Sequence, residues 1–159
     1  MADLLGDGNV KVTFCLTLSS ISNPPAAELN AGVDLQELLT KDGLDINPEQ
    51  AAVDNTSLAS RDETEDAGTS KYNLELTGKR QEADVDDVAW NTLTDRQLGF
   101  LAVRRNRAHE DDWEAGDPAE VYPVRCGRPR MQPPAINTAQ TFKSKLYNYK
   151  APDPVAVVA

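Results

Sequence analysis

The segment LGFLAVRRNRAHEDDWEAGDPAEVYPVRCGRP, residues 98–129, decides the fold class. Two apolar runs, Leu98–Val103 and Val121–Cys126, flank a polar stretch that ends at Gly116-Asp117-Pro118. Apolar runs bounded by glycine and proline predict two β-strands joined by a long turn. Because both runs are apolar on both faces, we expect something to cover them, either a helix of the same chain or neighbouring copies.

Three further segments predict strands, two of them by their alternation of apolar and polar residues and the third by apolar residues on both of its faces. In Val10–Leu18 the residues between the apolar ones are small or polar, so we expect that face to meet water or a polar partner. Lys71–Thr77 alternates in the same way, and Gln140–Tyr149 predicts the last strand of the fold. Residues 26–40 are ambiguous and favour a strand, and Asp42-Gly43 predicts a turn after them.

One helix is predicted, over residues 84–93. Asp84 or Asp86 can cap its N-terminus, and apolar side chains recur at helical spacing from Val85 to Leu93. One short helix cannot shield several strands, so it should close one end or side of a sheet. The sequence therefore predicts a mainly β fold, a sandwich or barrel with one flanking helix, in a single domain over residues 1–159.

Two segments are expected to extend from that body. Asp45–Gly68 is acidic and poor in aromatic residues, so it is either a solvated loop or a segment that orders on contact with another subunit. Together with the strand after it, this region predicts a projecting hairpin over about residues 45–70. The apolar, proline-containing residues 151–159 predict a C-terminal arm that is either disordered or docked on a neighbour.

The formal net charge of −10 argues against nonspecific binding to nucleic acid or anionic membranes. Residues 1–100 contain 7 Lys/Arg and 19 Asp/Glu, whereas residues 101–159 contain 9 and 7. This unevenness reflects either different faces of one surface or complementary faces for self-association. No apolar run approaches the length of a membrane span, and the first residues do not resemble a secretion signal.

Enzyme chemistry finds little support in the sequence. His109 is the single histidine, and no Ser or Cys lies in a strained, glycine-flanked turn. The consecutive residues His109–Asp112 rarely converge on one cation in such an order, and the abundant carboxylates carry no specific glycosidase signal. Cys15 and Cys126 show no metal-ligand spacing and are expected to be reduced structural thiols. We therefore expect no catalytic residues, no metal and no cofactor.

Six segments stand out by their order and spacing: Ala27–Asp34, Asp42–Leu44, Val88–Leu93, Leu98–Arg105, Ala115–Asp117 and Val121–Gly127. In that order they resemble the major tail proteins of long-tailed, non-contractile phages, nearest to those of phages of high-GC Gram-positive hosts. The resemblance implies a β-sandwich or barrel whose subunits close into hexameric rings. The rings would stack into a tail tube through which DNA passes during ejection without specific binding.

The same resemblance implies the partners and the location. The partners would be other copies of the chain and other tail proteins, namely the tape measure, the tail terminator and the baseplate or tip, with no membrane. The protein would be made in the host cytoplasm and reside in the virion tail. The alternatives are another virion β-protein, such as a tail terminator or capsid decoration protein, and a small β-sandwich carbohydrate-binding domain.

The arginine clusters lack interleaved aromatic residues, so we expect ion pairs with acidic loops of adjacent subunits rather than nucleic-acid contacts. The residues expected at contacts between subunits or rings are Arg61, Asp62, Glu63, Glu65, Asp66, Arg104, Arg105, Arg125, Arg128, Val155 and Val157. Asn73 and Glu75 lie on a solvent-type strand face and are candidates to line the lumen, the alternative being the outer surface of the tube.

Overall fold

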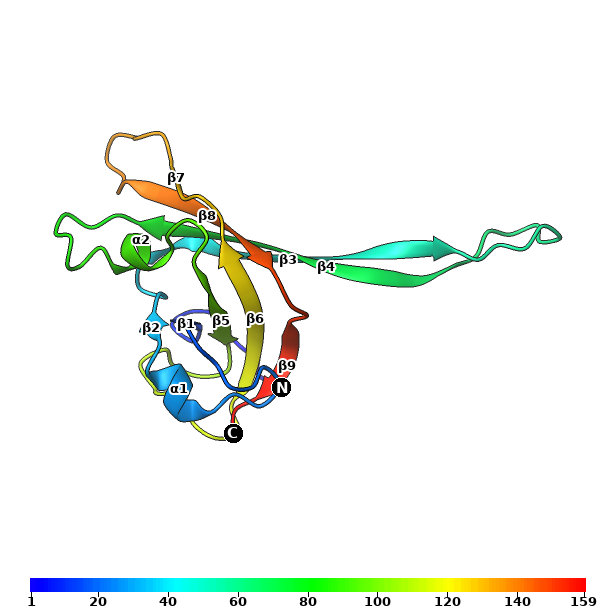
Figure 1. The fold of residues 1–159 in the computed structure, drawn as a ribbon, viewed down its shortest axis with the longest axis horizontal. Helices are drawn as coiled ribbons and strands as arrows, with labels where there is room; N and C mark the ends of the chain where they lie inside the picture. The colour runs from blue at the N-terminus through cyan, green and yellow to red at the C-terminus, as the bar shows by residue number, and fades with distance from the viewer.

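The structure, a computed structural model, describes residues 1–159. Its centre is the predicted strand pair: β5 (Leu98–Arg104) and β6 (Pro118–Cys126) run antiparallel, with Phe100 opposite Pro123. They belong to a nine-stranded antiparallel sheet with the main order β2-β1-β5-β6-β8-β4-β3 (Figure 1). The other strands are β1 (Lys11–Cys15), β2 (Val33–Asp34), β3 (Leu39–Asp54), β4 (Glu65–Lys79), β7 (Arg130–Met131), β8 (Thr141–Asn148) and β9 (Asp153–Val157). The prediction of a mainly β fold is confirmed.

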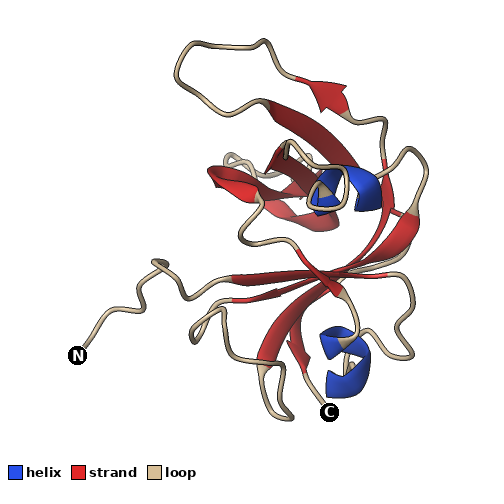
Figure 2. Ribbon diagram, turned by 90° about the vertical axis from the view of Figure 1, so that its left-hand side faces the viewer, coloured by secondary structure: helices blue, strands red, loops and turns tan.

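The sheet curls, and its inner face encloses the larger part of the core. Strands β5 and β6 run down the body, whereas β3 and β4 run across its top (Figures 1 and 2). Inside the curl, 15 buried residues form one cluster, among them Phe14, Leu101, Tyr122 and Phe142. Alternate residues of each strand supply this cluster, as the period of two requires.

The outer face of β1, β5 and β6 is buried as well. A second cluster of nine buried residues lies there, including Phe100, Trp113 and Val121. Helix α1 (Ala26–Asn30), the β5–β6 connection and the C-terminal residues contribute to it, so the same chain supplies the cover that the sequence requires. Of the two expectations for the polar face of β1, water is therefore wrong and a polar partner is confirmed, because Lys11 and Thr13 there bond to Asp34. Thr13 on that face accepts a hydrogen bond from Trp113 Nε1 at 3.0 Å and is fully buried.

The helices differ from the prediction of one helix over residues 84–93. Only α2 (Val88–Thr92) forms there, and Val85 is 83% exposed. Neither Asp84 nor Asp86 caps α2. The N-cap residue is Asp87, whose carboxylate accepts hydrogen bonds from Arg80 Nε and the Gln81 backbone N–H instead of from the first turn of α2. The second helix, α1, lies in residues 26–40, where a strand is expected; strand structure there is limited to the two residues of β2 and the first two of β3.

Strands β3 and β4 form a long hairpin that projects from the body (Figure 1). Residues 45–70 are therefore mostly paired strand, and only the connecting loop, residues 55–64, lies outside the two strands. The turn predicted at Asp42-Gly43 is wrong, because both residues lie within β3 at a shift of register. A Cβ at Gly43 would collide with the Thr77 carbonyl, so glycine permits the close approach of the two backbones there.

The C-terminal residues belong to the sheet instead of forming a free arm. Strand β9 pairs with the first half of β6, with Ala156 opposite Ala119. The buried side chains of Ala156 and Val158 join the second core cluster, and the Val158 N–H donates to the Asp117 carbonyl at 2.9 Å. Burial of these alternate residues outweighs the cost of ordering the segment. Strand β8 is consequently the penultimate strand and not the last.

Candidate assembly surfaces

The outer half of the hairpin, which we call the arm, consists of residues 48–72. Beyond Leu74, which pairs with Leu146 of β8, the two strands pair only with each other, and nearly all their side chains are exposed. At the base of the arm, Tyr72 still packs against Tyr122 of the larger core cluster. The tip is braced by its own polar groups: the Thr64 N–H donates to Thr56 Oγ1 at 2.9 Å, and Thr64 Oγ1 donates to the Asn55 side chain at 2.7 Å. An arm without apolar cover has no core of its own.

The arm is acidic. Hydrogen bonds from Thr56 hold the pKa of the Asp54 carboxyl below its usual range, which keeps that group ionised. None of the predicted contact residues at the tip forms an ion pair within the subunit. These residues are Arg61, Asp62, Glu63, Glu65 and Asp66.

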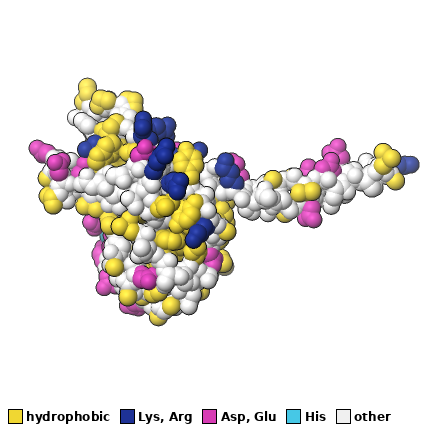
Figure 3. Space-filling model, in the orientation of Figure 1, with side chains coloured by type: hydrophobic (Ala, Val, Ile, Leu, Met, Phe, Trp, Pro, Cys, Tyr) yellow, Lys and Arg dark blue, Asp and Glu magenta, His cyan; other side chains and the backbone are white.

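A surface of opposite charge lies on the outer side of β4, β6 and β8. We call it the basic face, and its cations are Lys71, Arg125, Arg130, Lys143, Lys145 and Lys150. Lys and Arg side chains gather over β7 and β8 in Figure 3, whereas acidic groups are spaced along the arm. The lumen candidates Asn73 and Glu75 lie at this face, with Glu75 3.6 Å from Lys143 Nζ and 3.8 Å from Arg130 Nη2. Their surroundings are therefore positive, the reverse of what DNA sliding past would require.

Sequence reasoning singled out the arginines and missed the lysines of the basic face. The alternation of residues 141–148 is the signal that was available. Because Phe142, Ser144 and Leu146 are all buried, Lys143 and Lys145 must share the opposite face of β8.

The predicted arginine contacts separate into two kinds. Arg104 is fully buried in its own subunit and donates to the carbonyls of Ala108, Asp111 and Asp112. It has no surface to offer a neighbour, so we remove it from the interface set. Arg105 is half-exposed and pairs with Glu120 of its own chain.

The other two arginines lie in the open. Arg125 is exposed on β6, and the side chain of Arg128 is 85% exposed with only a distant pairing to Asp95 at 3.9 Å. The structure thus leaves Arg125 and Arg128 available for contacts outside the subunit.

Strand β9 presents an apolar edge. Val155 is 81% exposed and Val157 is 50% exposed, although the residue between them is buried. Together with Leu4 and Pro118 they line a cavity of about 360 Å³. An exposed strand edge with apolar side chains favours association with another chain.

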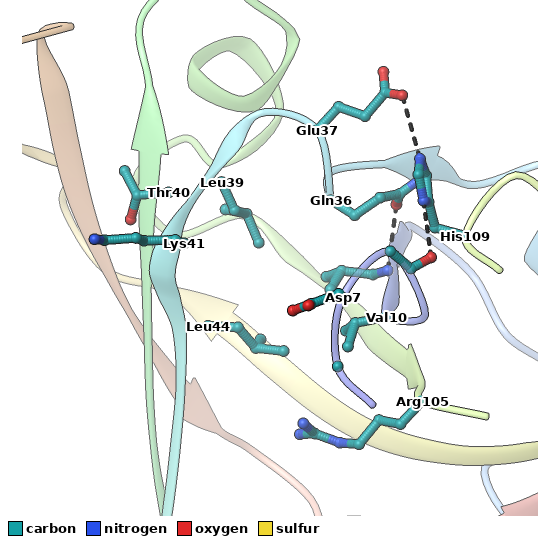
Figure 4. Close-up of a pocket in the computed structure, with 13 residues that line it drawn as sticks. Asp7, Val10, Gln36, Glu37, Leu39, Thr40, Lys41, Leu44, Arg105 and His109 are labelled. Carbon is teal, nitrogen blue, oxygen red and sulfur yellow. Dashed lines mark hydrogen bonds and ion pairs between the residues drawn. The ribbon is translucent and has the colours of Figure 1, made fainter. Parts of the chain in front are cut away.

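The largest hollow, about 680 Å³, opens between β1 and the start of β3 (Figure 4). His109 Nδ1 lies 3.0 Å from the Gly8 carbonyl, and its Nε2 lies 3.5 Å from Glu37. Asp7 and Lys41 complete the polar lining. The hollow contains no cysteine or serine that a base could activate, and across the chain no group of three metal-ligating side chains converges.

Both cysteines are free and buried, as expected. Burial raises the pKa of Cys15 to about 11 and that of Cys126 to about 12, so neither side chain is a reactive thiolate. The tryptophans offer no flat exposed platform for a sugar ring, because Trp113 is buried and Trp90 is half-buried with its ring edge-on to Phe142. No helix combines the length and apolar character that a membrane crossing needs.

Comparisons with known proteins concern the fold and the family of the chain. Nine chains of solved structures match. One comes from a structure titled "Cryo-EM structure of the anti-feeding prophage (AFP) baseplate, 6-fold symmetrised", with a TM-score of 0.61 at 10% sequence identity over 96% of each chain. At that identity the likeness concerns the fold. No curated protein matches the sequence. The model of one family, described as phage tail tube protein, matches residues 1–159, and the chain belongs to that family.

Proposed function

We propose that this virion tail protein is the repeating subunit of a tail tube, with copies closing into hexameric rings that stack into the conduit for DNA ejection. The match of the phage tail tube family over residues 1–159 carries the proposal. The similar structure is described as a 6-fold symmetrised baseplate, which supports six subunits in a ring. The work of such a subunit is mechanical, so we expect no catalytic activity.

The described surfaces support head-to-tail assembly. The outer edges of β3 and β9 lack strand partners, and such edges are removed when identical copies close into a ring. Different surfaces of one chain that contact each other generate closed rings or stacked filaments, depending on the rotation and translation between copies. We infer that the arm reaches the next ring and that Val155 and Val157 contact a neighbour in the same ring.

The finer parts of the proposal come from the sequence resemblance: a long non-contractile tail, a phage of a high-GC Gram-positive host, and contacts with the tape measure, tail terminator and baseplate or tip. Synthesis would take place in the host cytoplasm before assembly. Among the alternatives, the buried Trp113 and the half-buried Trp90 disfavour a carbohydrate-binding domain.

The arm provides the test. Gln50 and Ser70 are directly opposite each other, so replacing residues 51–69 with Asn-Gly closes the hairpin on a two-residue turn without moving the register. The shortened subunit should fold, since residues 51–69 contribute nothing to either core cluster and Tyr72, which packs against the larger one, is retained. We expect wild-type protein to form long striated tubes by negative-stain electron microscopy and the shortened protein to form none. Unaltered tubes from the shortened subunit would refute the role of the arm, and wild-type single rings would favour a tail terminator.

A further inference from the structure

We propose that the basic face is the receptor for the arm tip of a second copy of this chain. This inference rests on the proposed tube function and names the two surfaces that meet when one subunit holds the next. The receptor consists of Lys71, Arg125, Arg130, Lys143, Lys145 and Lys150, and the arm tip consists of residues 54–66.

Both surfaces carry charges that their own subunit leaves without partners. On the basic face, Glu75 is the one carboxylate that meets cations, and it is shared by Arg130 and Lys143 at 3.8 and 3.6 Å. Lys71, Arg125 and Lys145 form no ion pair in the subunit, and neither do the carboxylates of the arm tip. Each surface supplies the charge that the other lacks, which favours their encounter and fixes their orientation.

The basic face also contains a groove of suitable shape. Strands β4 and β8 pair as far as Leu74 and Leu146 and then separate. The gap between them is a groove of about 310 Å³ rimmed by Lys71, Lys145 and Lys150. Asn148 lines the same groove, and its side-chain oxygen is buried without a hydrogen-bond partner. A buried acceptor without a donor is costly, so the subunit alone leaves the lining of this groove incompletely satisfied.

A subunit cannot fill its own groove with its own tip. The arm is continuous paired strand, and from Ile46 to Asp54 it extends about 25 Å at roughly 3.3 Å per residue. In Figure 1 it points away from the body, and no bend returns the tip toward β8. The occupant must therefore be the tip of another copy.

A charge exchange tests the pairing. Lys145→Glu reverses the receptor and Glu65→Lys reverses the tip; both side chains are exposed and neither forms an ion pair. We expect each variant alone to need an about tenfold higher concentration to form tubes. An equimolar mixture should assemble near the wild-type concentration, because each variant then offers the surface that the other needs. The matched control is Arg96→Glu, a change from a basic to an acidic side chain at an exposed site between α2 and β5, outside the basic face and the open strand edges, which should assemble as wild type does.

The outcomes separate the inference from the function. If wild-type protein forms tubes and Lys145→Glu forms them at the same concentration, the receptor assignment is overturned and the tube function stands. If the mixture fails to assemble better than either variant, the pairing of these two surfaces is likewise overturned. Binding of duplex DNA by wild type but not by Lys145→Glu, with assembly unchanged, would assign the face to nucleic acid instead.

A second measurement is independent of tube formation. Leu58→Cys at the tip and Tyr147→Cys beside the groove place one exposed thiol on each of two copies. Mild oxidation of the mixture should yield a disulfide-linked pair, and the buried native cysteines should not compete. The control replaces Tyr147→Cys by Glu37→Cys, an exposed position at the hollow between β1 and β3. Equal cross-linking in both mixtures would overturn the proposal even if wild-type protein formed no tubes.

Discussion

Replacing Arg104 by alanine should destabilise the isolated subunit severely. Its guanidinium donates to the carbonyls of Ala108 and Asp111 at 2.8 Å and of Asp112 at 2.9 Å, and it lies 3.4 Å from Asp117. These bonds fasten the β5–β6 connection to the body while the side chain is entirely buried. Truncation removes all of them at once and leaves the carbonyls of Ala108 and Asp111 without this donor, whereas the Asp112 carbonyl still accepts from Arg107.

The expected loss in the free energy of unfolding depends on which partner Asp117 keeps after Arg104 is truncated. Removing one partner of a buried ion pair costs about 3–5 kcal/mol. Asp117 keeps a second partner, Arg107 at 2.8 Å, so we expect the lower part of that range, about 3–4 kcal/mol. With a urea dependence of about 2 kcal/mol per molar, the midpoint of unfolding should fall by about 1.5–2 M. The control is Arg105→Ala, a half-exposed ion pair worth about 0–1 kcal/mol.

Urea unfolding followed by tryptophan fluorescence measures both variants, because Trp113 lies 5.3 Å from the Arg104 guanidinium. Midpoints that shift equally for the two variants would refute the structural role of Arg104. If the Arg104→Ala subunit were as stable as the control but failed to assemble, Arg104 would return to the set of interface residues.

Three more predictions concern the body of the fold. Gly99→Ala should cost about 1–3 kcal/mol in a thermal melt, since its Cβ would collide with Phe14 and lie 2.8 Å from the Cys15 carbonyl oxygen; an unchanged melting temperature would contradict this packing. Because burial raises the pKa values of Cys15 and Cys126, neither should react with a thiol reagent at pH 8 until the chain is unfolded, and rapid labelling of the native protein would disprove it. The hydrogen bond of His109 to the Gly8 carbonyl, together with the nearby acids, raises the pKa of His109. The stabilisation by its positive charge is therefore fully present below about pH 6.5 and is lost as the pH rises through the raised pKa. A His109→Gln variant should lack that part of the pH dependence of unfolding, and an unchanged profile would show that His109 plays no part.

The sequence predicted those elements whose signal is local. The β5–β6 pair, β1, β4 and β8 each show an apolar run or an alternation that a few residues suffice to establish. The projecting hairpin was also foreseen in outline, because the acidic segment leads directly into the alternating residues of β4. Even so, the pairing of β3 along the whole arm has no local signal, since its residues there are exposed on both sides and show no alternation of apolar and polar side chains.

The missed features depend on distant parts of the chain. Strand β9 pairs with β6 across a separation of more than 30 residues, and nothing within residues 151–159 reveals the apolar face that receives them. The outer face of β1 looks solvent-exposed because Thr13 is polar, yet its hydroxyl meets Trp113 and Asp34 from other elements. Arg104 looked like a surface charge for the same reason: its acceptors are backbone carbonyls, which leave no mark on residue identity.

The arm is only two strands wide, and no third layer buries either of its faces. Such a ribbon is marginally stable by itself. Its amide hydrogens should therefore exchange with solvent by local opening, whereas those of β5 and β6 should exchange only on global unfolding. Each docking event then includes the free-energy cost of ordering the ribbon, which lowers the affinity of any single contact between an arm and a groove. Free subunits should consequently remain in solution for some time. Tube growth should show a lag that ends once a first ring presents many grooves together.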